Sequence, residues 1–154
     1  MQIIMAYTNL LYHIVFRTHA SRPTITEAHE QELYKYIWGF VKDKNCVLHR
    51  INGMPDHVHM LVEIHPSLAV SDFMRMLKIS ASNYMKSHRE WFPMFGGWGK
   101  SYCAISYSSK EKEMVRHYIM NQKEHHRHVA FADELRQLLT DNGIAFDEAY
   151  YLKE

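Results

Sequence analysis

The sequence predicts an α+β fold in which helices pack against an antiparallel sheet, and three observations support this prediction. Segments with the two-residue period of strands alternate along the chain with segments of helical period. Their order is strand, helix, strand, strand, helix, strand, helix. Turn-forming residues separate them, and no internal repeat interrupts them. This order is typical of a ferredoxin-like or RRM-like split βαβ sandwich, with helices on one face and the first and third strands in the middle of the sheet.

The first strand and the first helix follow from residues 7–43. Tyr7–Arg17 alternates with the period of a strand and is apolar on both faces, as expected for a central strand. Thr24 and Glu27 have the spacing of a capping box, which satisfies free backbone N–H groups at a helix start. Apolar residues then recur at helical spacing. We therefore expect a helix from this capping box to about Asp43.

A hairpin that carries two histidines follows the first helix. Residues 46–51 have the pattern of a strand, and Asn52-Gly53 is a strong tight-turn signal before the strand that begins at His57. Alternation divides this second strand into a core face and an opposite face. The core face has Val58, Met60, Val62 and Ile64, and the opposite face has His57, His59, Leu61 and Glu63. Two imidazoles at this spacing can reach one metal ion without bending the backbone.

The second half of the chain adds three helices and one strand. An aromatic loop with three glycines, residues 91–100, is expected to be mobile and to lie near ligand. The other expected elements are a helix over Val70–Tyr84, a strand over Tyr102–Tyr107, a helix from near Ser109 to about His126, and a helix around Phe131–Leu139 that ends at Asn142-Gly143. A tail from Ile144 closes the chain.

Length and composition bound the class of protein. A chain of 154 residues fits one domain, residues 1–154, with a core at about 7–128 and a C-terminal helix and tail at 129–154. Apolar and charged fractions of 47% and 23% are those of an ordinary globular protein. Residues 1–5 lack the features of a signal peptide, and no apolar run reaches membrane-spanning length, so we expect a cytoplasmic protein with reduced Cys46 and Cys103. The net charge of +1 does not by itself indicate nucleic acid.

The third helix carries a second group of chemically useful side chains. Tyr118 and Gln122 are four residues apart and so share a helix face. Taken alone, this pair is explained by packing and a surface amide. The basic run Lys123, His125, His126, Arg127 and His128 follows it. Together with the two-histidine strand, this C-terminal tyrosine-bearing helix indicates a site that combines imidazoles, a phenol and an amide.

These motifs resemble a known family. His57-Val58-His59, after Pro55-Asp56, resembles the HUH motif of single-strand DNA nucleases. Tyr118-Ile119-Met120-Asn121-Gln122 resembles the tyrosine motif of the IS200/IS605-family transposases, which have a single catalytic tyrosine. The likeness extends over most of the chain, from Tyr12–Phe16 through residues 98–108 to the tail at Leu138–Tyr151.

The resemblance implies a function and a site. His57, His59 and Gln122 would bind a divalent ion, Mg²⁺ or Mn²⁺, which acts as a Lewis acid on a phosphodiester. Tyr118 would attack the phosphorus, become joined to the 5′ phosphate and release a 3′ hydroxyl. The implied substrate is single-stranded DNA with hairpin ends. The implied assembly is a homodimer with composite sites, in which the histidines of one subunit meet the tyrosine helix of the other.

Other polar and aromatic residues are candidates for supporting roles. Unpaired bases need stacking platforms and phosphates need cations. The candidates are Trp98, Tyr102, Tyr107, Arg75, Lys78, Lys100, Lys110 and Arg116, and for each aromatic residue core packing is the alternative. His13 is expected to be a hydrogen-bonded packing residue. Asp56 and Glu63 can hydrogen-bond a ligand histidine, with a turn and a surface role as the respective alternatives.

Three other functions share parts of this pattern. REP-associated tyrosine transposases share the chemistry, but their tyrosine motif continues with Asn-Pro where this chain has Asn121-Gln122. A noncatalytic RRM-like nucleic-acid-binding module shares the topology, yet its aromatic signature is absent from the central strands. A histidine-triad nucleotide hydrolase needs a third alternating histidine where this chain has Leu61.

Overall fold

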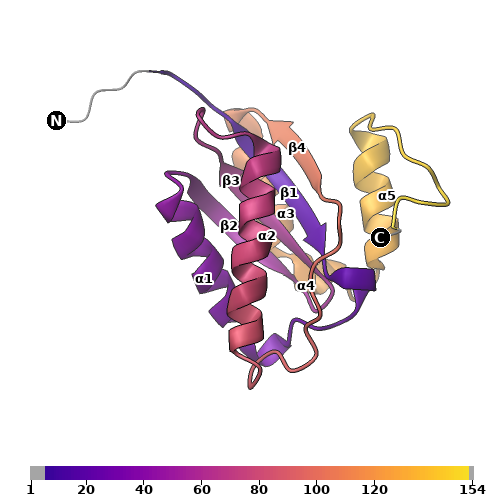
Figure 1. Cartoon of the computed structure of the whole chain (residues 1–154). Coiled ribbons are helices and arrows are strands. Elements are labelled where there is room, and N and C mark those ends of the chain that lie inside the picture. Colours follow the sequence, from indigo (N-terminus) through magenta and orange to yellow (C-terminus); the bar gives the residue numbers. More distant parts are fainter. Residues whose placement is uncertain (1–5, 153–154) are drawn as a thin grey trace.

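The computed structural model describes residues 6–152, and its centre is a four-stranded sheet with helices on both faces (Figure 1). The strands are β1 (Leu11–Arg17), β2 (Val47–Met54), β3 (His57–Glu63) and β4 (Cys103–Tyr107). Neighbouring strands are antiparallel in the spatial order β2-β3-β1-β4. This order confirms the predicted ferredoxin-like arrangement and the central places of β1 and β3. The expectation for residues 1–5 lies outside the described residues.

The helices cover both faces of the sheet. They are α1 (Glu30–Asp43), α2 (Val70–Ser87), α3 (Lys112–Met120), α4 (Gln122–His125) and α5 (Phe131–Asp141). In Figure 1, α1 and α2 lie together on one face, α3 and α4 lie behind the sheet, and α5 stands beside the β1 and β4 side. The sequence predicts helices on one face of the sheet, but the structure also places α3, α4 and α5 over the second face. Within residues 6–152, no helix has both the length and the apolar character for crossing a membrane.

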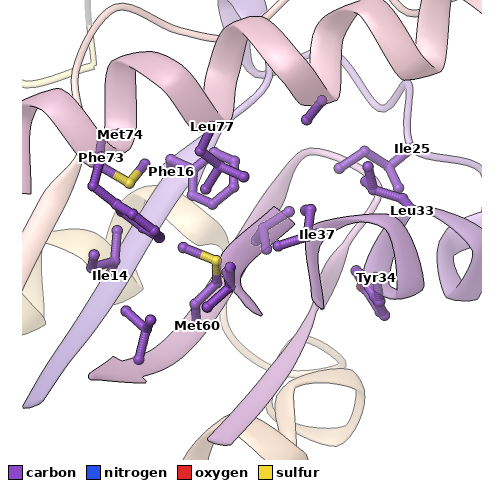
Figure 2. Close-up of a cluster of buried hydrophobic side chains, with 14 of the residues drawn as sticks. Ile14, Phe16, Ile25, Leu33, Tyr34, Ile37, Met60, Phe73, Met74 and Leu77 are labelled. Carbon is purple, nitrogen blue, oxygen red and sulfur yellow. The ribbon is translucent and has the colours of Figure 1, made fainter. Parts of the chain in front are cut away.

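The larger core lies between the sheet and the helices α1 and α2 (Figure 2). It includes Ile14, Phe16 and Met60 from the strands, Leu33 and Ile37 from α1, and Phe73, Met74 and Leu77 from α2. The expected core face of β3 faces these helices, since Val58, Met60, Val62 and Ile64 are all buried in this cluster. Because side chains alternate along a strand, His57 and His59 must point to the second face.

Two smaller apolar clusters hold the helices of the second face. Under α3, Leu11 and Leu61 of the sheet pack against Val115 and Ile119. Under α5, the buried residues are Val15, Cys103, Ile105, Phe131 and Leu139. Both Cys46 and Cys103 are buried free thiols, as the sequence predicts. Polar residues of the second face contact both clusters, since His57 stacks on Phe131 and Tyr118 packs against the cluster under α3.

The hairpin is present, but its predicted turn is wrong. Asn52 and Gly53 belong to β2, where they pair with His59 and Val58, and the turn is formed by Pro55 and Asp56. Gly53 is required for close approach, because a Cβ atom there would meet the carbonyl oxygen of His57 and lie 3.0 Å from Cα of Val58. The signal at Asn52-Gly53 thus reports strand contact and not a chain reversal.

The first helix begins later than its capping-box signal predicts. Thr24 and Ile25 are tied to the preceding loop and to the hairpin, since Ile25 N–H donates to the carbonyl of Pro55 at 2.9 Å. A single 3-10 turn over Glu27–His29 then leads into α1. A capping box does form elsewhere, where Ser108 and Glu111 exchange hydrogen bonds before α3.

The third helix is interrupted where the sequence predicts continuity from near Ser109 to His126. A 3-10 turn at Ser109–Glu111 leads into α3, which ends at Met120, and α4 begins at Gln122. The Asn52 side-chain amide donates to the carbonyls of Ile119 at 3.0 Å and Met120 at 3.1 Å. These carbonyls would otherwise accept from the next turn of a continuous helix. The tyrosine helix is therefore anchored to the strand next to His59.

We predict opposite effects on stability for alanine at two glycines. Gly53→Ala should lower the free energy of unfolding by about 1–3 kcal/mol, because the new methyl group overpacks the hairpin. Gly39→Ala should raise it by about 0.5–1 kcal/mol, because Gly39 lies inside α1 and the added methyl group would have nothing within 4 Å. Urea denaturation of both variants measures the two changes. A Gly53→Ala protein as stable as the parent would contradict the close approach.

Candidate active site

His57 and His59 are fully buried and project from β3 toward the second sheet face. The turn at Pro55-Asp56 places the Asp56 carboxylate 2.7 Å from Nδ1 of His57. This contact fixes the orientation of the His57 ring and directs its Nε2 atom into the site. Asp56 therefore serves both roles that the sequence left open. Glu63 instead contacts His49 on the neighbouring strand.

His13, on the adjacent strand β1, supports His59. Nε2 of His13 lies 2.8 Å from Nδ1 of His59, and the two rings stack with centroids 5.1 Å apart. Burial lowers the pKa of His13 to about 3 and the pKa of His59 to about 4, so both are neutral at pH 7. In a neutral pair one nitrogen donates and the other accepts, so His13 and His59 set each other's tautomer. The predicted role of His13 as a hydrogen-bonded packing residue is confirmed.

Tyr118 and Gln122 approach the histidines from the junction of α3 and α4. Gln122 is fully buried, and its Oε1 atom lies 3.4 Å from Nε2 of His57. The Tyr118 ring lies edge-on to His13 and His59, with centroids 5.9 and 6.0 Å away. One chain thus brings together all four residues that the resemblance singled out. A second subunit is not needed for this contact, and the composite arrangement stays a prediction.

Lys123 fixes the α4 segment to the rest of the fold. Its ammonium group contacts the Glu30 carboxylate of α1 at 2.8 Å and donates to the carbonyl of Gly53. Asn52 Oδ1 lies 3.3 Å from the same ammonium group. Because Lys123 follows Gln122 directly, these contacts hold Gln122 against the hairpin that carries the histidines.

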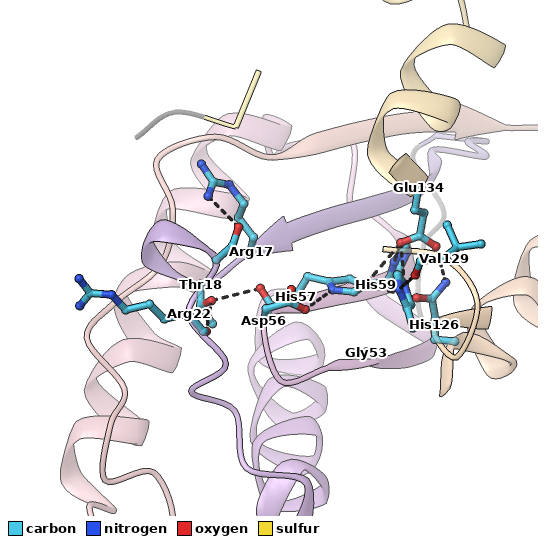
Figure 3. A network of polar contacts seen from close by, with 12 residues as sticks. Arg17, Thr18, Arg22, Gly53, Asp56, His57, His59, His126, Val129 and Glu134 are labelled. Atoms are coloured by element: carbon cyan, nitrogen blue, oxygen red, sulfur yellow. Dashed lines mark hydrogen bonds and ion pairs between the residues drawn. The ribbon is translucent and has the colours of Figure 1, made fainter. Parts of the chain in front are cut away.

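Glu134 of α5 reaches into the centre of this cluster (Figure 3). Its Oε2 atom accepts hydrogen bonds from Nε2 of Gln122 at 2.9 Å and from the Tyr118 hydroxyl. Its Oε1 atom lies 3.0 Å from Nε2 of His59 and 2.9 Å from Nε2 of His126. One buried carboxylate therefore connects the strand, the tyrosine helix and the C-terminal helix.

The protonation states follow from these contacts. Burial opposes the charge on Glu134, but hydrogen bonds from His126, His57 and His59 outweigh burial and hold the pKa of this carboxyl far below its usual range. Burial, together with the hydrogen bond to Glu134 and its charge, raises the pKa of Tyr118 well above its usual value. Burial also opposes a charge on His57, yet its bonds to Asp56 and Glu134 raise the pKa overall. At pH 7, Glu134 is an anion and the Tyr118 phenol keeps its proton.

The donor set fits a divalent metal ion. Within residues 6–152, one donor atom from each of His57, His59, His126 and Glu134 lies within 4.8 Å of the others. Imidazole nitrogen and carboxylate oxygen are ligands of divalent transition metals, at about 2.0–2.2 Å from the ion. Ligands on opposite sides of such an ion are about 4.4 Å apart, so small side-chain shifts suffice. Two of these four residues were expected, and Gln122 lies beside them.

Glu134 was not predicted from the sequence, and His126 was predicted only as part of a basic run. Glu134 carries a signal that could have been noticed, because it lies on the apolar stripe of its helix. Phe131, Leu135 and Leu138 recur around it at spacings of three and four residues. A carboxylate on the core side of a helix needs partners, since an unpaired buried charge is strongly unfavourable.

The residues proposed for DNA binding do not converge on the site. Arg75 and Lys78 belong to α2, on the far side of the sheet from the histidines. Lys78 donates to the carbonyls of Gly99 at 2.8 Å and Ser101 at 3.0 Å, and Trp98 packs edge-on against Phe16. Lys100 and Lys110 are exposed, and Arg116 pairs with Glu113. Tyr102 packs against the main core, and Tyr107 packs under α3 and α5. Trp98 therefore packs on the core, which was the alternative to base stacking.

Residues 6–122 match the family described as "Transposase IS200 like". The chain is 33% identical over 75 residues to the ISDra2 transposase TnpA of Deinococcus radiodurans, over 45% of this chain and 52% of that protein. The aligned part is thus about half of that relative's length.

Two solved structures have a similar fold. A candidate transposase from D. radiodurans R1 superposes with a TM-score of 0.60 at 24% identity, over 79% of this chain and 98% of that chain. A REP-associated tyrosine transposase bound to a REP hairpin superposes with a TM-score of 0.60 at 14% identity, over 96% of this chain and 93% of that chain. At these identities the likeness concerns the fold.

The fold is shared with two solved transposase structures, and in it a strand with two histidines faces a helix that carries a tyrosine. The family match covers well over half of the chain. The chain therefore belongs to the family of IS200-like transposases.

We predict that the purified protein binds Mn²⁺ through this cluster. His59→Ala should weaken the affinity more than tenfold, because it removes an imidazole that is fully buried in the donor set. His128→Ala is the matched control, since the His128 side chain is 78% exposed and outside the cluster. Calorimetric titration with MnCl₂ measures both. Equal affinities of the two variants would contradict a metal site at these residues.

We also predict that Glu134 controls the titration of Tyr118. Glu134→Gln should lower the pKa of Tyr118 toward its usual value of about 10, because the substitution removes the carboxylate charge beside the phenol. Tyrosinate would then form at a lower pH than in the parent protein. The absorbance of tyrosinate, recorded against Tyr118→Phe versions of both proteins, isolates this one side chain. An unchanged Tyr118 titration would contradict the proposed electrostatic control.

Proposed function

We propose that this protein cuts and rejoins single-stranded DNA at the ends of an insertion sequence through a 5′-phosphotyrosine intermediate, with a divalent metal ion. The observation that carries the proposal is the convergence of a phenol, imidazoles, an amide and a carboxylate in one chain of the IS200-like family. A noncatalytic RRM-like binding module would need no such convergence on one face of its sheet.

The proposed chemistry assigns roles to Tyr118 and Glu134. The Tyr118 oxygen attacks the scissile phosphorus, a new bond joins this oxygen to the 5′ phosphate, and the bond to the 3′ oxygen breaks. The 3′ oxygen leaves as a hydroxyl after it takes up a proton. Glu134 Oε2 already accepts the hydrogen bond from Tyr118, so it orients the phenol and is nearest to the proton that the phenol loses. Attack by a 3′ hydroxyl on the phosphotyrosine reverses these bonds and reseals DNA.

The side chains of the cluster also indicate how a metal ion would be held and which ion it would be. His57, His59 and either Gln122 or the pair His126 and Glu134 would hold the ion and leave positions open for phosphate. When bound, the ion supplies Lewis-acid stabilisation of the phosphate charge. A set rich in imidazole favours a transition metal, so we propose Mn²⁺ ahead of Mg²⁺.

The proposed substrate and the proposed assembly both rest on the resemblance to the family. Insertion-sequence ends that form hairpins are the expected substrate. A REP hairpin, as in the similar REP-associated transposase, is the alternative. We keep the prediction of a homodimer, although the site residues meet within one chain. Sedimentation at working concentration measures the assembly, and a fully active monomer would contradict it.

Tyr118→Phe should abolish a covalent protein–DNA adduct while leaving DNA binding intact, because only the nucleophilic oxygen is removed. The assay incubates the protein with labelled single-stranded DNA that bears a hairpin, with Mn²⁺, with Mg²⁺ and with a chelator. Denaturing gels then separate the adduct from free DNA.

Tyr7→Phe is the matched control, since Tyr7 is 93% exposed and lies outside the cluster. It should form the adduct at the parent rate. An adduct that survives in Tyr118→Phe would overturn the assignment of the nucleophile. An adduct that forms equally well in the presence of chelator would overturn the metal requirement.

A further inference from the structure

A groove of about 530 Å³ follows the outer edge of β2, separate from the catalytic cluster. β2 is an edge strand, so its outer side has no neighbouring strand in the sheet. Residues from α1, β2 and α4 line the groove, and those that matter here are Tyr34, Trp38, Arg50, Asn52 and Lys123. None of the residues assigned to the chemistry lines it.

One end of the groove lies beside the catalytic site. Asn52 pairs across the hairpin with His59, and its side chain holds the last carbonyls of α3. Lys123 directly follows Gln122 and binds the backbone of Gly53. The groove therefore begins at residues that adjoin His59 and Gln122, and a DNA strand that leaves the site on this side would enter it directly.

The groove offers one aromatic surface and one uncommitted cation. Trp38 is 53% exposed, unusually open for an indole, and Lys42 lies 5.1 Å from its ring. The Nε atom of Arg50 is buried without a hydrogen-bond partner, and no carboxylate within residues 6–152 lies at ion-pair distance from Arg50. The acidic member of the lining, Glu30, is already neutralised by Lys123 at 2.8 Å.

We propose that this groove binds an unpaired stretch of the DNA strand next to the cleavage site, with one base stacked on Trp38 and one phosphate on Arg50. The proposal rests on the proposed function, because it takes single-stranded DNA as the substrate. Aromatic stacking combined with a cation that contacts the backbone is the usual chemistry of single-strand recognition.

A β-strand of another polypeptide is the competing occupant of an open sheet edge. The register of β2 against β3 is irregular between Leu48 and Arg50. A bulge of this kind disturbs the row of backbone groups that an added strand would need. The irregular edge therefore favours a nucleic-acid strand over a protein strand.

The test measures binding of a fluorescein-labelled oligothymidylate by anisotropy, in a Tyr118→Phe background with chelator present. Trp38→Ala should weaken binding about five- to a hundredfold through the loss of one stacked base, without changing the salt dependence. Arg50→Gln should weaken binding and reduce the slope of log affinity against log salt by about 0.7, the value for one phosphate contact to a single strand. The two variants thus give different signatures.

The controls remove an exposed aromatic ring and an exposed arginine elsewhere on the surface. Tyr7→Ala removes an exposed aromatic ring, and Arg136→Gln removes an exposed cation of α5 that pairs with Glu148. Both should bind as the parent does. Thermal unfolding of all four variants verifies that Trp38→Ala and Arg50→Gln are folded, and Trp38→Phe, which keeps a stacking ring, should restore most of the affinity.

Parent-like binding by Trp38→Ala and Arg50→Gln would overturn the proposal. A change in sedimentation by these variants, with DNA binding unchanged, would overturn it in favour of a protein partner at the edge. Since the background cannot form an adduct, the result is independent of the cleavage assay. If the parent protein forms no adduct but Trp38→Ala and Arg50→Gln still lose DNA binding, the proposed chemistry is refuted and the proposed DNA-binding groove is supported.

Discussion

The buried carboxylate of Glu134 is the group on which the second face of the sheet depends. An ion of this kind away from water is unfavourable by several kcal/mol unless partners compensate it. Here the partners come from three elements, His59 of β3, Tyr118 of α3 and Gln122 of α4, and from His126 directly after α4. The helices α3, α4 and α5 are thereby held in one arrangement around a single charge. Apolar packing attaches each helix to the sheet, and the carboxylate defines how the helices meet.

Local patterns were enough to predict the sheet and the direction of its histidines. The alternation from Val58 to Ile64 places four apolar side chains against α1 and α2, and this forces His57 and His59 to the opposite face. The strand order followed from the order of elements along the chain. Errors arose where a distant contact overrides a local signal. Gly53 looked like a turn residue, yet glycine is needed there because the backbone of His57 leaves no room for a Cβ atom.

The break between α3 and α4 has the same kind of cause. Nothing within the sequence from Ser109 to His126 stops a helix, and the predicted continuous helix was reasonable on propensity alone. The amide of Asn52, more than sixty residues earlier, takes the carbonyls of Ile119 and Met120. Glu134 was missed for a related reason, since its partners come from three elements that local periodicity cannot place together. The two histidines followed from strand alternation and the Tyr118–Gln122 pair from helical spacing, but only the family resemblance assigned the two groups to one catalytic site.

Hydrogen-bond capacity limits how the cluster can hold a cation. Nε2 of the neutral His59 ring lies 3.0 Å from Glu134, and as an N–H donor to this anion it has no lone pair to offer a metal ion. To bind an ion through Nε2, His59 must carry its proton on Nδ1, and then the contact at 2.8 Å makes His13 the acceptor. The change of tautomer releases Oε1 of Glu134 from His59, whereas Oε2 keeps Gln122 and the Tyr118 hydroxyl. The two oxygens of the Glu134 carboxylate therefore have different partners: Oε1 faces the imidazoles of the candidate metal site, and Oε2 holds the Tyr118 hydroxyl that we propose as the nucleophile.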